Sequence, residues 1–308
     1  MNDAQHKGNL QKKFIVPPFS VLDTKKKYWK DGKSKWDKFN IQSELGRDAT
    51  GSNTFQDLKN NPRKAETTKT IAKVGAISVF DPFLTEIMYR WFCPPNGKIL
   101  DPFAGGSVRG IVSSRLGYEY DGIELRNEQV MENLKQIPNE WNNKPNWIHG
   151  DSENLSVLVD KNRNYDMIFS CPPYYDLEKY SDEQGELSAL ETYEEFLDKY
   201  NSIISECVYR LQDNRFAVFV VSDIRDKKGF YRNLVGDTKS AFINNDMELY
   251  NDIIFLTAIG GLPLRCGIPF KKYRKVGRAH QNILVFYKGD VKKIPDIFGE
   301  KILVNNGL

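Results

Sequence analysis

Histidine and cysteine are scarce in this sequence. Its 308 residues include three histidines and four cysteines, and no two cysteines form a Cys-x-x-Cys pair. Zinc sites and disulfide frameworks need closely spaced ligands or paired cysteines, so neither is expected. We therefore predict that the chain holds no metal and that its cysteines are reduced.

Long apolar runs are absent as well. No stretch approaches the roughly 18 apolar residues of a membrane span, and residues 1–10 are polar, unlike a signal peptide. With 40% apolar and 28% charged residues, the composition is that of an ordinary globular protein. We expect a soluble, cytoplasmic protein without a membrane partner.

The net charge is only +3, but the charges are unevenly distributed. Residues 1–40 hold ten lysines against four aspartates, and residues 253–288 hold seven basic residues and no acid. Aromatic residues are interleaved with these charges, namely Trp29, Trp36, Phe270 and Tyr273. A single basic run is usually a solvated face, but two runs with interleaved aromatic residues favour a surface for a polyanion.

Composition divides the chain into three parts. Residues 1–75 are rich in Lys, Asn, Asp, Ser and Gly and contain one clear apolar stretch, so we interpret them as a loosely organised basic arm. Residues 76–290 alternate apolar segments with short polar connections and would form the main domain. Residues 291–308 would form a C-terminal tail.

A helix is predicted to begin at Asp81, because an aspartate before a proline combines a helix N-cap with a favoured first helical residue. Its apolar residues recur three and four residues apart, which is typical of a buried helix face. Pro94 and Pro95 end this helix. We therefore interpret the first Cys-Pro-Pro, at residues 93–95, as a helix terminator without a chemical role. A longer helix is predicted over residues 192–212.

Seven short apolar segments predict β-strands that alternate with helices. This alternation is typical of an α/β protein with a doubly wound, mostly parallel sheet. The last two strands flank a long loop, so we expect them to pair as an antiparallel hairpin. The predicted strands lie near residues 98–101, 118–124, 147–150, 166–170, 216–221, 249–256 and 282–287.

Three successive strands end in acidic residues, which a parallel sheet would bring to one edge. Asp101 opens the glycine-rich turn DPFAGGS, where small residues let a ligand approach the backbone. Glu124 follows 23 residues later, close to the ~20 at which an acid reaches a ribose in nucleotide-binding folds. Asp151 is placed to accept a hydrogen bond from an adenine amino group. The three acids suggest an adenosine ligand that carries an amine, although Glu124 alone is equally consistent with a surface residue opening a helix.

A second Cys-Pro-Pro, at residues 171–173, follows a strand, so helix termination does not explain it. Prolines have no N–H, and the segment therefore presents carbonyl acceptors that would draw the hydrogens of an amino group. Tyr174 offers a face on which a flat ring can stack. The alternative is a strand-end turn with a packed aromatic residue, and the adjacent adenosine signature favours the functional interpretation.

The sequences "DPFAGGS" and "CPPYY" resemble the two main motifs of the S-adenosylmethionine-dependent DNA amino-methyltransferases, which methylate adenine N6 or cytosine N4. The resemblance covers most of residues 79–287, and the whole chain looks most like phage-type DNA methylases. It implies a Rossmann-like methyltransferase fold with a seven-stranded sheet, S-adenosylmethionine as cofactor, and methylation of a flipped-out base in double-stranded DNA, as in restriction–modification.

The resemblance also implies which residues form the site. The cofactor would be held by Phe80, Asp81, Asp101, Phe103, Ala104, Gly105, Glu124 and Asp151. The target base would be held by Ser170, Cys171, Pro172, Pro173 and Tyr174. Cys171 departs from the family's Asp, Asn or Ser, and because a thiol is a weak acceptor, adenine and cytosine both stay open, with a tilt to cytosine. Ser107 replaces the third glycine of the cofactor motif.

No separate recognition domain fits between the two motifs, which are 70 residues apart. DNA contacts should therefore come from the N-terminal arm and from the loops at residues 223–233 and 257–281. The predicted contacts are Arg225, Lys227, Lys228, Arg265, Lys271, Lys272, Arg274, Lys275 and Arg278. Two alternatives stay open: a methyltransferase for RNA or protein amides, and a catalytically idle DNA-binding protein that keeps the fold.

Overall fold

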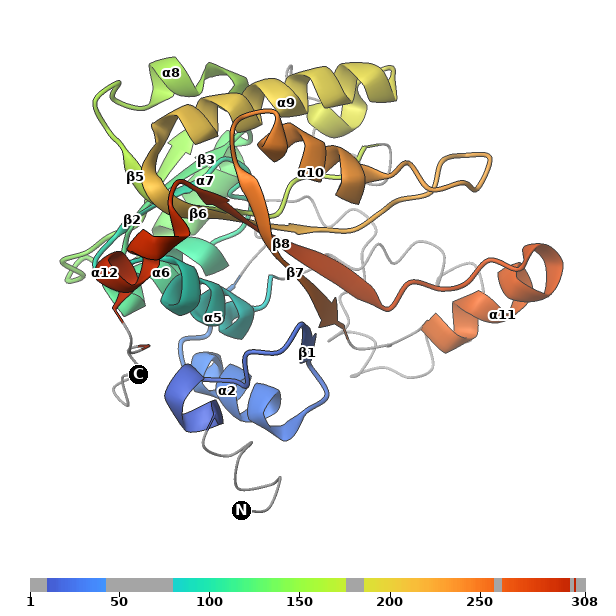
Figure 1. Cartoon of the computed structure of the whole chain (residues 1–308), viewed down its shortest axis with the longest axis horizontal. Helices are drawn as coiled ribbons and strands as arrows, with labels where there is room; N and C mark the ends of the chain where they lie inside the picture. The colour runs from blue at the N-terminus through green and yellow to red at the C-terminus, as the bar shows by residue number, and fades with distance from the viewer. Residues whose placement is uncertain (1–9, 43–79, 176–185, 258–261, 300–301, 303–308) are drawn as a thin grey trace.

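The computed structural model describes residues 10–42, 80–175, 186–257, 262–299 and 302, and within them one eight-stranded sheet carries helices on both faces (Figure 1). The strands are β1 Val21–Asp23, β2 Lys98–Asp101, β3 Glu119–Glu124, β4 Asn146–His149, β5 Tyr165–Ser170, β6 Leu211–Val221, β7 Glu248–Leu256 and β8 His280–Lys288. The α-helices are α2 Lys27–Asp37, α5 Pro82–Phe92, α6 Val108–Leu116, α7 Asn127–Lys135, α8 Leu155–Leu158, α9 Tyr193–Arg210, α10 Leu234–Ile243, α11 Leu262–Tyr273 and α12 Ile294–Phe298.

The strand order is β1-β7-β8-β6-β5-β2-β3-β4, and neighbouring strands are parallel except where β8 is involved. The prediction of a doubly wound, mostly parallel, Rossmann-like sheet is confirmed, and so is the antiparallel pairing of the last two strands. The order reverses between β2 and β5. The carboxyl ends of these two strands therefore flank the crevice in which such folds bind ligands.

All seven predicted strands are present, but the count of seven is wrong because β1 adds an eighth. β1 pairs in parallel with β7 at the edge of the sheet, with Val21 opposite Ile254 and Asp23 opposite Leu256. Three residues are too few for the period-two alternation that identifies a strand in a sequence. Only tertiary pairing makes this segment a strand.

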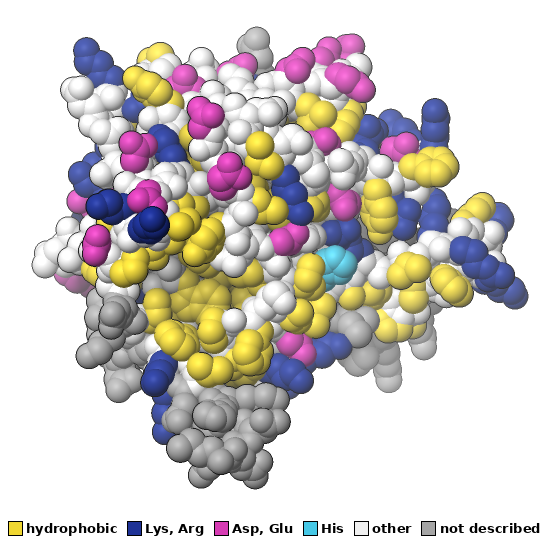
Figure 2. Space-filling model, viewed as in Figure 1, with side chains coloured by type: hydrophobic (Ala, Val, Ile, Leu, Met, Phe, Trp, Pro, Cys, Tyr) yellow, Lys and Arg dark blue, Asp and Glu magenta, His cyan; other side chains and the backbone are white. Residues whose placement is uncertain are grey.

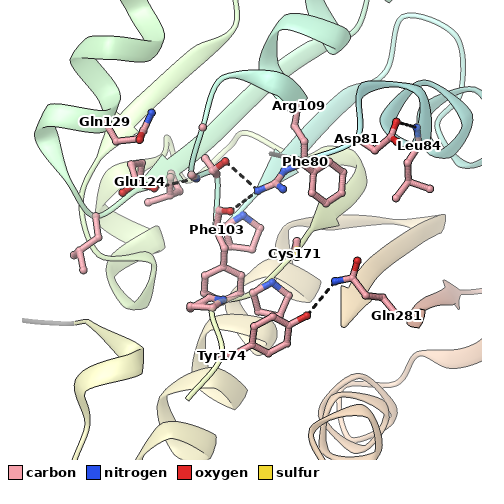
Figure 3. Close-up of a pocket in the computed structure, with 18 of the residues that line it drawn as sticks. Phe80, Asp81, Leu84, Phe103, Arg109, Glu124, Gln129, Cys171, Tyr174 and Gln281 are labelled. Carbon is pink, nitrogen blue, oxygen red and sulfur yellow. Dashed lines mark hydrogen bonds between the residues drawn. The ribbon is translucent and has the colours of Figure 1, made fainter. Parts of the chain in front are cut away.

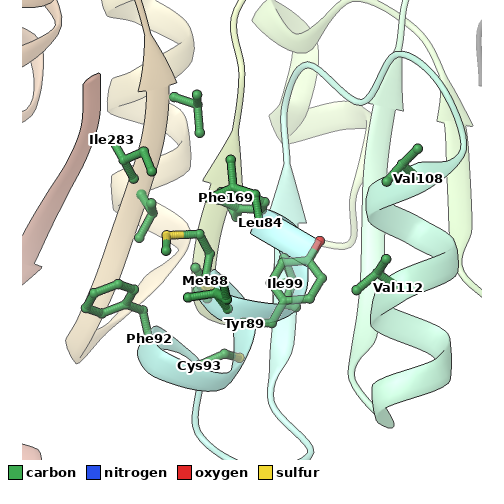
Figure 4. Close-up of a cluster of buried hydrophobic side chains, with 14 of the residues drawn as sticks. Leu84, Met88, Tyr89, Phe92, Cys93, Ile99, Val108, Val112, Phe169 and Ile283 are labelled. Carbon is green, nitrogen blue, oxygen red and sulfur yellow. The ribbon is translucent and has the colours of Figure 1, made fainter. Parts of the chain in front are cut away.

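Alternating side chains of the strands enter two separate cores. Ile99 and Phe169 face the core under α2, α5 and α6, whereas Leu100 and Ile168 face the core under α8, α9 and α10. Figure 4 shows the first core, in which α5 lays Leu84, Met88 and Tyr89 against the strands. Both faces of the sheet are covered, as a parallel sheet requires.

Helix α5 begins and ends where the sequence predicts. The Asp81 carboxylate accepts hydrogen bonds from the Phe83 and Leu84 N–H groups, at 2.9 and 3.2 Å. The helix ends at Phe92, followed by Cys93, which is 3% exposed. The interpretation of the first Cys-Pro-Pro as a helix terminator is confirmed.

The described part of the N-terminal segment is not a loose arm. Trp29 and Trp36 of α2 are each 1% exposed, so they are not part of a polyanion surface. The Trp29 ring packs against Phe83, with centroids 5.1 Å apart, and the Trp36 indole N–H donates to Glu86 Oε2 at 2.8 Å. The sequence conceals this packing because large apolar residues are sparse in α2 and lysines surround them. The predicted domain boundaries at residues 75 and 290 stay predictions.

The loop predicted over residues 257–281 contains helix α11, which the sequence analysis missed. Pro263, Pro269 and Gly267 interrupt its sequence, and Leu264 and Ile268 are 82% and 80% exposed. Because α11 buries no continuous apolar face, it leaves no helical period to detect. The helix projects from the body of the molecule (Figure 1).

The packing of α2 makes a testable prediction. Trp36→Ala should lower the free energy of unfolding by about 3–5 kcal/mol, the usual cost of removing a large buried aromatic side chain. Urea denaturation followed by circular dichroism measures this change. The matched control is Lys35→Ala, on the exposed side of the same helix, which should stay within about 0.5 kcal/mol of the parent. Equal stability of both variants would contradict the packing.

Candidate active site

A cavity of about 540 Å³ lies at the carboxyl ends of the central strands. Its wall includes the glycine-rich turn after β2, the end of β3 and the second Cys-Pro-Pro after β5 (Figure 3). The volume falls in the range of small-molecule sites. The structure thus brings the two sequence motifs, which are far apart in the chain, into one cavity.

Glu124 holds the glycine-rich turn in place. Its carboxylate accepts hydrogen bonds from the Gly105 N–H at 2.9 Å and from the Arg126 N–H at 2.9 Å. Gly105 has φ +53, a conformation that favours glycine. The Asn133 side chain donates to the Gly105 carbonyl at 2.8 Å. Phe103, Ala104, Gly105 and Glu124, which the resemblance assigns to the cofactor, all line the cavity.

Asp101 lies beneath the cavity and not on its wall, which corrects the expectation that it contacts the ligand. Its carboxylate is 0% exposed and accepts hydrogen bonds from the Tyr120 hydroxyl at 2.8 Å, the Ser170 hydroxyl at 2.6 Å and the Phe103 N–H at 3.2 Å. An ion pair with Arg109 completes its contacts. Ser170 is likewise fully buried, so its hydroxyl serves Asp101 instead of the target base. Asp101 and Ser170 therefore hold the glycine-rich turn and the end of β5 in place beneath the cavity.

Arg109 is the main site residue that the sequence analysis missed. Burial is the largest influence on its pKa and lowers it, but the Asp101 carboxylate, together with Tyr120 and Cys171, more than offsets burial, and the pKa of the guanidinium lies above its ordinary value. Arg109 also donates to the Phe103 and Ala104 carbonyls and stacks on the Phe80 ring, 4.6 Å from its centroid. A lone arginine in the otherwise apolar first turn of α6, just after the glycine-rich turn, was the available signal.

The second Cys-Pro-Pro forms the lower part of the cavity in Figure 3. Cys171, Pro172, Pro173 and Tyr174, which the resemblance assigns to the target base, line it. The side-chain amide of Gln281 on β8 donates to the Tyr174 hydroxyl at 3.1 Å, and Gln281 lines the cavity too. Gln281 was not predicted, because no local pattern links it to a tyrosine 107 residues away.

The two tyrosines after this Cys-Pro-Pro have different surroundings. Tyr175 is 7% exposed, donates to the Glu191 carbonyl at 2.8 Å and carries Arg232 over its ring at 4.7 Å. It therefore packs in the core. Tyr174 alone faces the cavity.

The remaining predicted cofactor residues, Phe80, Asp81 and Asp151, also line the cavity. The Asp151 carboxylate is paired with Lys199 Nζ at 2.5 Å, so part of its acceptor capacity is already used. Figure 3 shows Phe80 and Asp81 on the opposite side of the cavity from Glu124 and Gln129.

The two predicted basic loops lie side by side. A Cβ added at Gly229 would lie 2.2 Å from Lys275 Nζ, and Arg278 pairs with Asp223 at 3.2 Å. We call residues 223–233 together with residues 262–278 the basic ridge, excluding the Arg265 side chain, which lies outside the described structure. Figure 2 shows Lys and Arg side chains gathered at the right of the view, where α11 projects.

Members of the basic ridge differ in their surroundings. Lys271, Lys272 and Arg274 are exposed on and just after α11. Arg225 donates to the Gly229 carbonyl at 2.8 Å, and Arg278, besides its ion pair, donates to Asn282 at 2.8 Å. Arg225 and Arg278 therefore also hold the ridge in its conformation.

Comparison with known proteins agrees with the motifs. Residues 165–305 match a family model described as DNA methylase, of the N6 and N4 methyltransferases. This match confirms, over these residues, the predicted resemblance to S-adenosylmethionine-dependent DNA amino-methyltransferases, and it supports methyl transfer with that cofactor. No curated protein matches the chain at a significant level.

Several solved methyltransferase structures are distantly similar. TrmN from Thermus thermophilus is 12% identical in sequence, with a TM-score of 0.46. The match covers 69% of this chain and 50% of TrmN, so this chain spans half the length of TrmN. Magnesium protoporphyrin IX methyltransferase from Synechocystis PCC 6803, solved with bound SAM, is 12% identical, with 64% and 71% covered and a TM-score of 0.39. A methyltransferase from Pyrococcus furiosus is 18% identical, with 75% of this chain and 100% of that chain covered and a TM-score of 0.43.

Within the described ranges, no helix has both the length and the apolar character to cross a membrane.

The Asp101 contacts predict how the site responds to mutation. Asp101→Ala should abolish measurable binding of S-adenosylhomocysteine in calorimetry, because it releases the turn at Phe103 and leaves the Arg109 charge buried without its counter-ion. The matched control is Asp121→Ala. Asp121 is another buried aspartate, 3% exposed, and it lies away from the cavity. Its carboxylate accepts a hydrogen bond from the Tyr165 hydroxyl at 2.7 Å. Asp121→Ala should cost stability but keep the affinity, and unchanged affinity in Asp101→Ala would refute the assignment.

Proposed function

We propose that the chain is a DNA methyltransferase that transfers a methyl group from S-adenosylmethionine to the exocyclic amine of a flipped-out base, N4 of cytosine or N6 of adenine. One observation carries the proposal. The glycine-rich turn after β2 and the donor-poor Cys-Pro-Pro-Tyr segment after β5 line a single cavity. A methyl donor and an acceptor amine need such neighbouring sites.

The cavity has the chemistry that the cofactor requires. The turn at Phe103, Ala104 and Gly105 gives close access to the backbone, and Glu124, which lines the same cavity, would bind the ribose diol. Asp81, on the opposite side, is suited to the ammonium of the methionine part. When bound, S-adenosylmethionine supplies a methyl group on a positively charged sulfur, which an amine attacks directly.

The chain's own residues would prepare the target amine. The Cys171–Pro172 segment offers backbone carbonyls that draw the hydrogens of the amine and free its lone pair. Tyr174, held by Gln281, offers its ring face to the base. Cys171 acts here as a weak acceptor and not as a nucleophile. The slight tilt to cytosine rests on the resemblance, because Cys171 is nearest in size to the serine found at this position in the family.

The basic ridge would contact the DNA backbone. It lies next to the cavity through Gln281, which is on the cavity wall and only three residues from Arg278. Phosphate contacts from Lys and Arg position the duplex without reading its sequence. Double-stranded DNA is therefore the proposed partner.

Methyl transfer can be tested with tritiated S-adenosylmethionine and unmethylated DNA. Tyr174→Ala should lower the rate constant of label transfer by about tenfold or more, because stacking of a base on an aromatic ring contributes about 1–3 kcal/mol. Tyr174→Phe is the matched control: it keeps the ring, removes the hydroxyl that Gln281 bonds, and should retain most activity. Label transfer to RNA or protein but not DNA would favour the alternative substrates, and cofactor binding without transfer to any substrate would favour an idle DNA-binding protein.

DNA binding through the basic ridge predicts a change in salt dependence. Lys271→Ala combined with Lys272→Ala should reduce the slope of log K against log salt concentration by about two, one for each lost phosphate contact. Fluorescence anisotropy with a labelled duplex at several salt concentrations measures the slope. Lys292→Ala combined with Lys293→Ala removes the same charge from exposed positions before α12, and should leave the slope unchanged. Equal slopes in both double variants would refute the assignment.

A further inference from the structure

Helix α2 contributes two lysines to the wall of the cavity. Lys30 and Lys33 line it together with Thr24 and Trp29 from the same N-terminal segment. Lys33 Nζ lies 3.6 Å from Asp81 Oδ2. This part of the chain, expected from the sequence to be a DNA-contacting arm, therefore reaches the proposed cofactor site.

The position of these lysines is fixed by the buried face of α2. Trp29 and Gly32 are buried, and a Cβ added at Gly32 would lie 2.2 Å from the Phe83 ring, so the helix lies very close to α5. The Trp29 indole N–H also donates to Asp81 Oδ2 at 3.1 Å. Lys30 and Lys33, three residues apart, share one side of the helix beside this contact.

The charges at this end of the cavity are complementary to an α-amino acid. Asp81 supplies a carboxylate whose side chain is 12% exposed, and Lys33 supplies an ammonium beside it. Two other cations line the cavity, Arg109 and Arg126. Arg109 is already committed to Asp101 and to two backbone carbonyls. Arg126 follows Glu124, which lies on the opposite side of the cavity from Asp81. Lys30 and Lys33 are therefore the cations placed to meet a ligand carboxylate there.

A DNA phosphate is a less suitable occupant of this corner. Figure 3 places Asp81 and Phe80 away from Tyr174 and Gln281, where the target base would enter, and away from Glu124, where the ribose would lie. Three parts of the cavity wall would thus hold three groups: the Tyr174 side the target base, the Glu124 side the ribose, and the Asp81 side the remaining part of the cofactor. The corner at Asp81 is left for the amino acid end of the cofactor.

We propose that Lys30 and Lys33 bind the carboxylate of the amino acid end of a nucleoside-linked amino acid, opposite the ammonium held by Asp81. The inference rests on the proposed function, since the ligand is its cofactor. It makes α2 a part of the cofactor site that favours ligands with a carboxylate over those without one. Lys30 and Lys33 are thus specificity residues at the end of the cofactor remote from its adenine.

Calorimetry with two ligands tests this assignment. S-adenosylhomocysteine carries the amino acid carboxylate, and 5′-deoxy-5′-methylthioadenosine lacks it. The double variant Lys30→Met and Lys33→Met should bind S-adenosylhomocysteine about tenfold or more weakly, because it loses charge-assisted hydrogen bonds. Its affinity for methylthioadenosine should change by less than about twofold.

Lys35→Met is the matched control, with the same chemical change on the same helix but away from the cavity, and it should leave both affinities unchanged. An equal loss of affinity for both ligands in the double variant would show that α2 acts only structurally. Unchanged affinity for S-adenosylhomocysteine would show that the two lysines do not bind its carboxylate. Either result overturns the inference while the proposed function stands. Failure of the parent protein to bind S-adenosylhomocysteine would overturn both.

Discussion

The buried ion pair between Asp101 and Arg109 is the constraint on which the site depends. Asp101 ends β2, and its carboxylate also binds Tyr120 from β3 and Ser170 from β5. One side chain therefore ties β2 to both of its neighbouring strands. Such a pair contributes little net stability when intact, but losing one partner leaves an uncompensated charge in the interior, at a cost of about 3–5 kcal/mol.

This arrangement explains how two distant motifs keep a fixed relation. Arg109 binds the carbonyls of the glycine-rich turn, and Ser170 immediately precedes the second Cys-Pro-Pro. Because both reach the same carboxylate, a shift of either motif would strain the other. A methyl donor and an acceptor amine require such preorganised spacing, since small misplacements of reacting groups are costly.

Sequence patterns predicted most of the sheet but only part of the site. The seven strands and the cap of α5 were predictable because each has a strong local signal: an apolar run or an aspartate before proline. β1 and α11 were missed, one being too short and the other having no buried apolar stripe. Local patterns likewise placed the residues of both motifs in the right region.

The errors within the site have a common physical origin. Asp101 was expected at the ligand because a strand-end acid usually points there, and only the structure reveals that Arg109 holds it below the cavity. Gln281 and the α2 lysines come from distant parts of the chain, so their approach to the site depends on tertiary packing. Residues brought together only by the fold leave no spacing that a sequence can reveal.

The short pairing of β1 with β7 has a consequence for how the molecule behaves toward its own copies. A long outer strand offers a row of unsatisfied N–H and C=O groups on which another chain can add a strand. β7 spans Glu248–Leu256, and β1 covers its Ile254–Leu256 end with three residues of its own. The N-terminal segment thus shields the apolar end of β7 from intermolecular strand addition and so opposes aggregation.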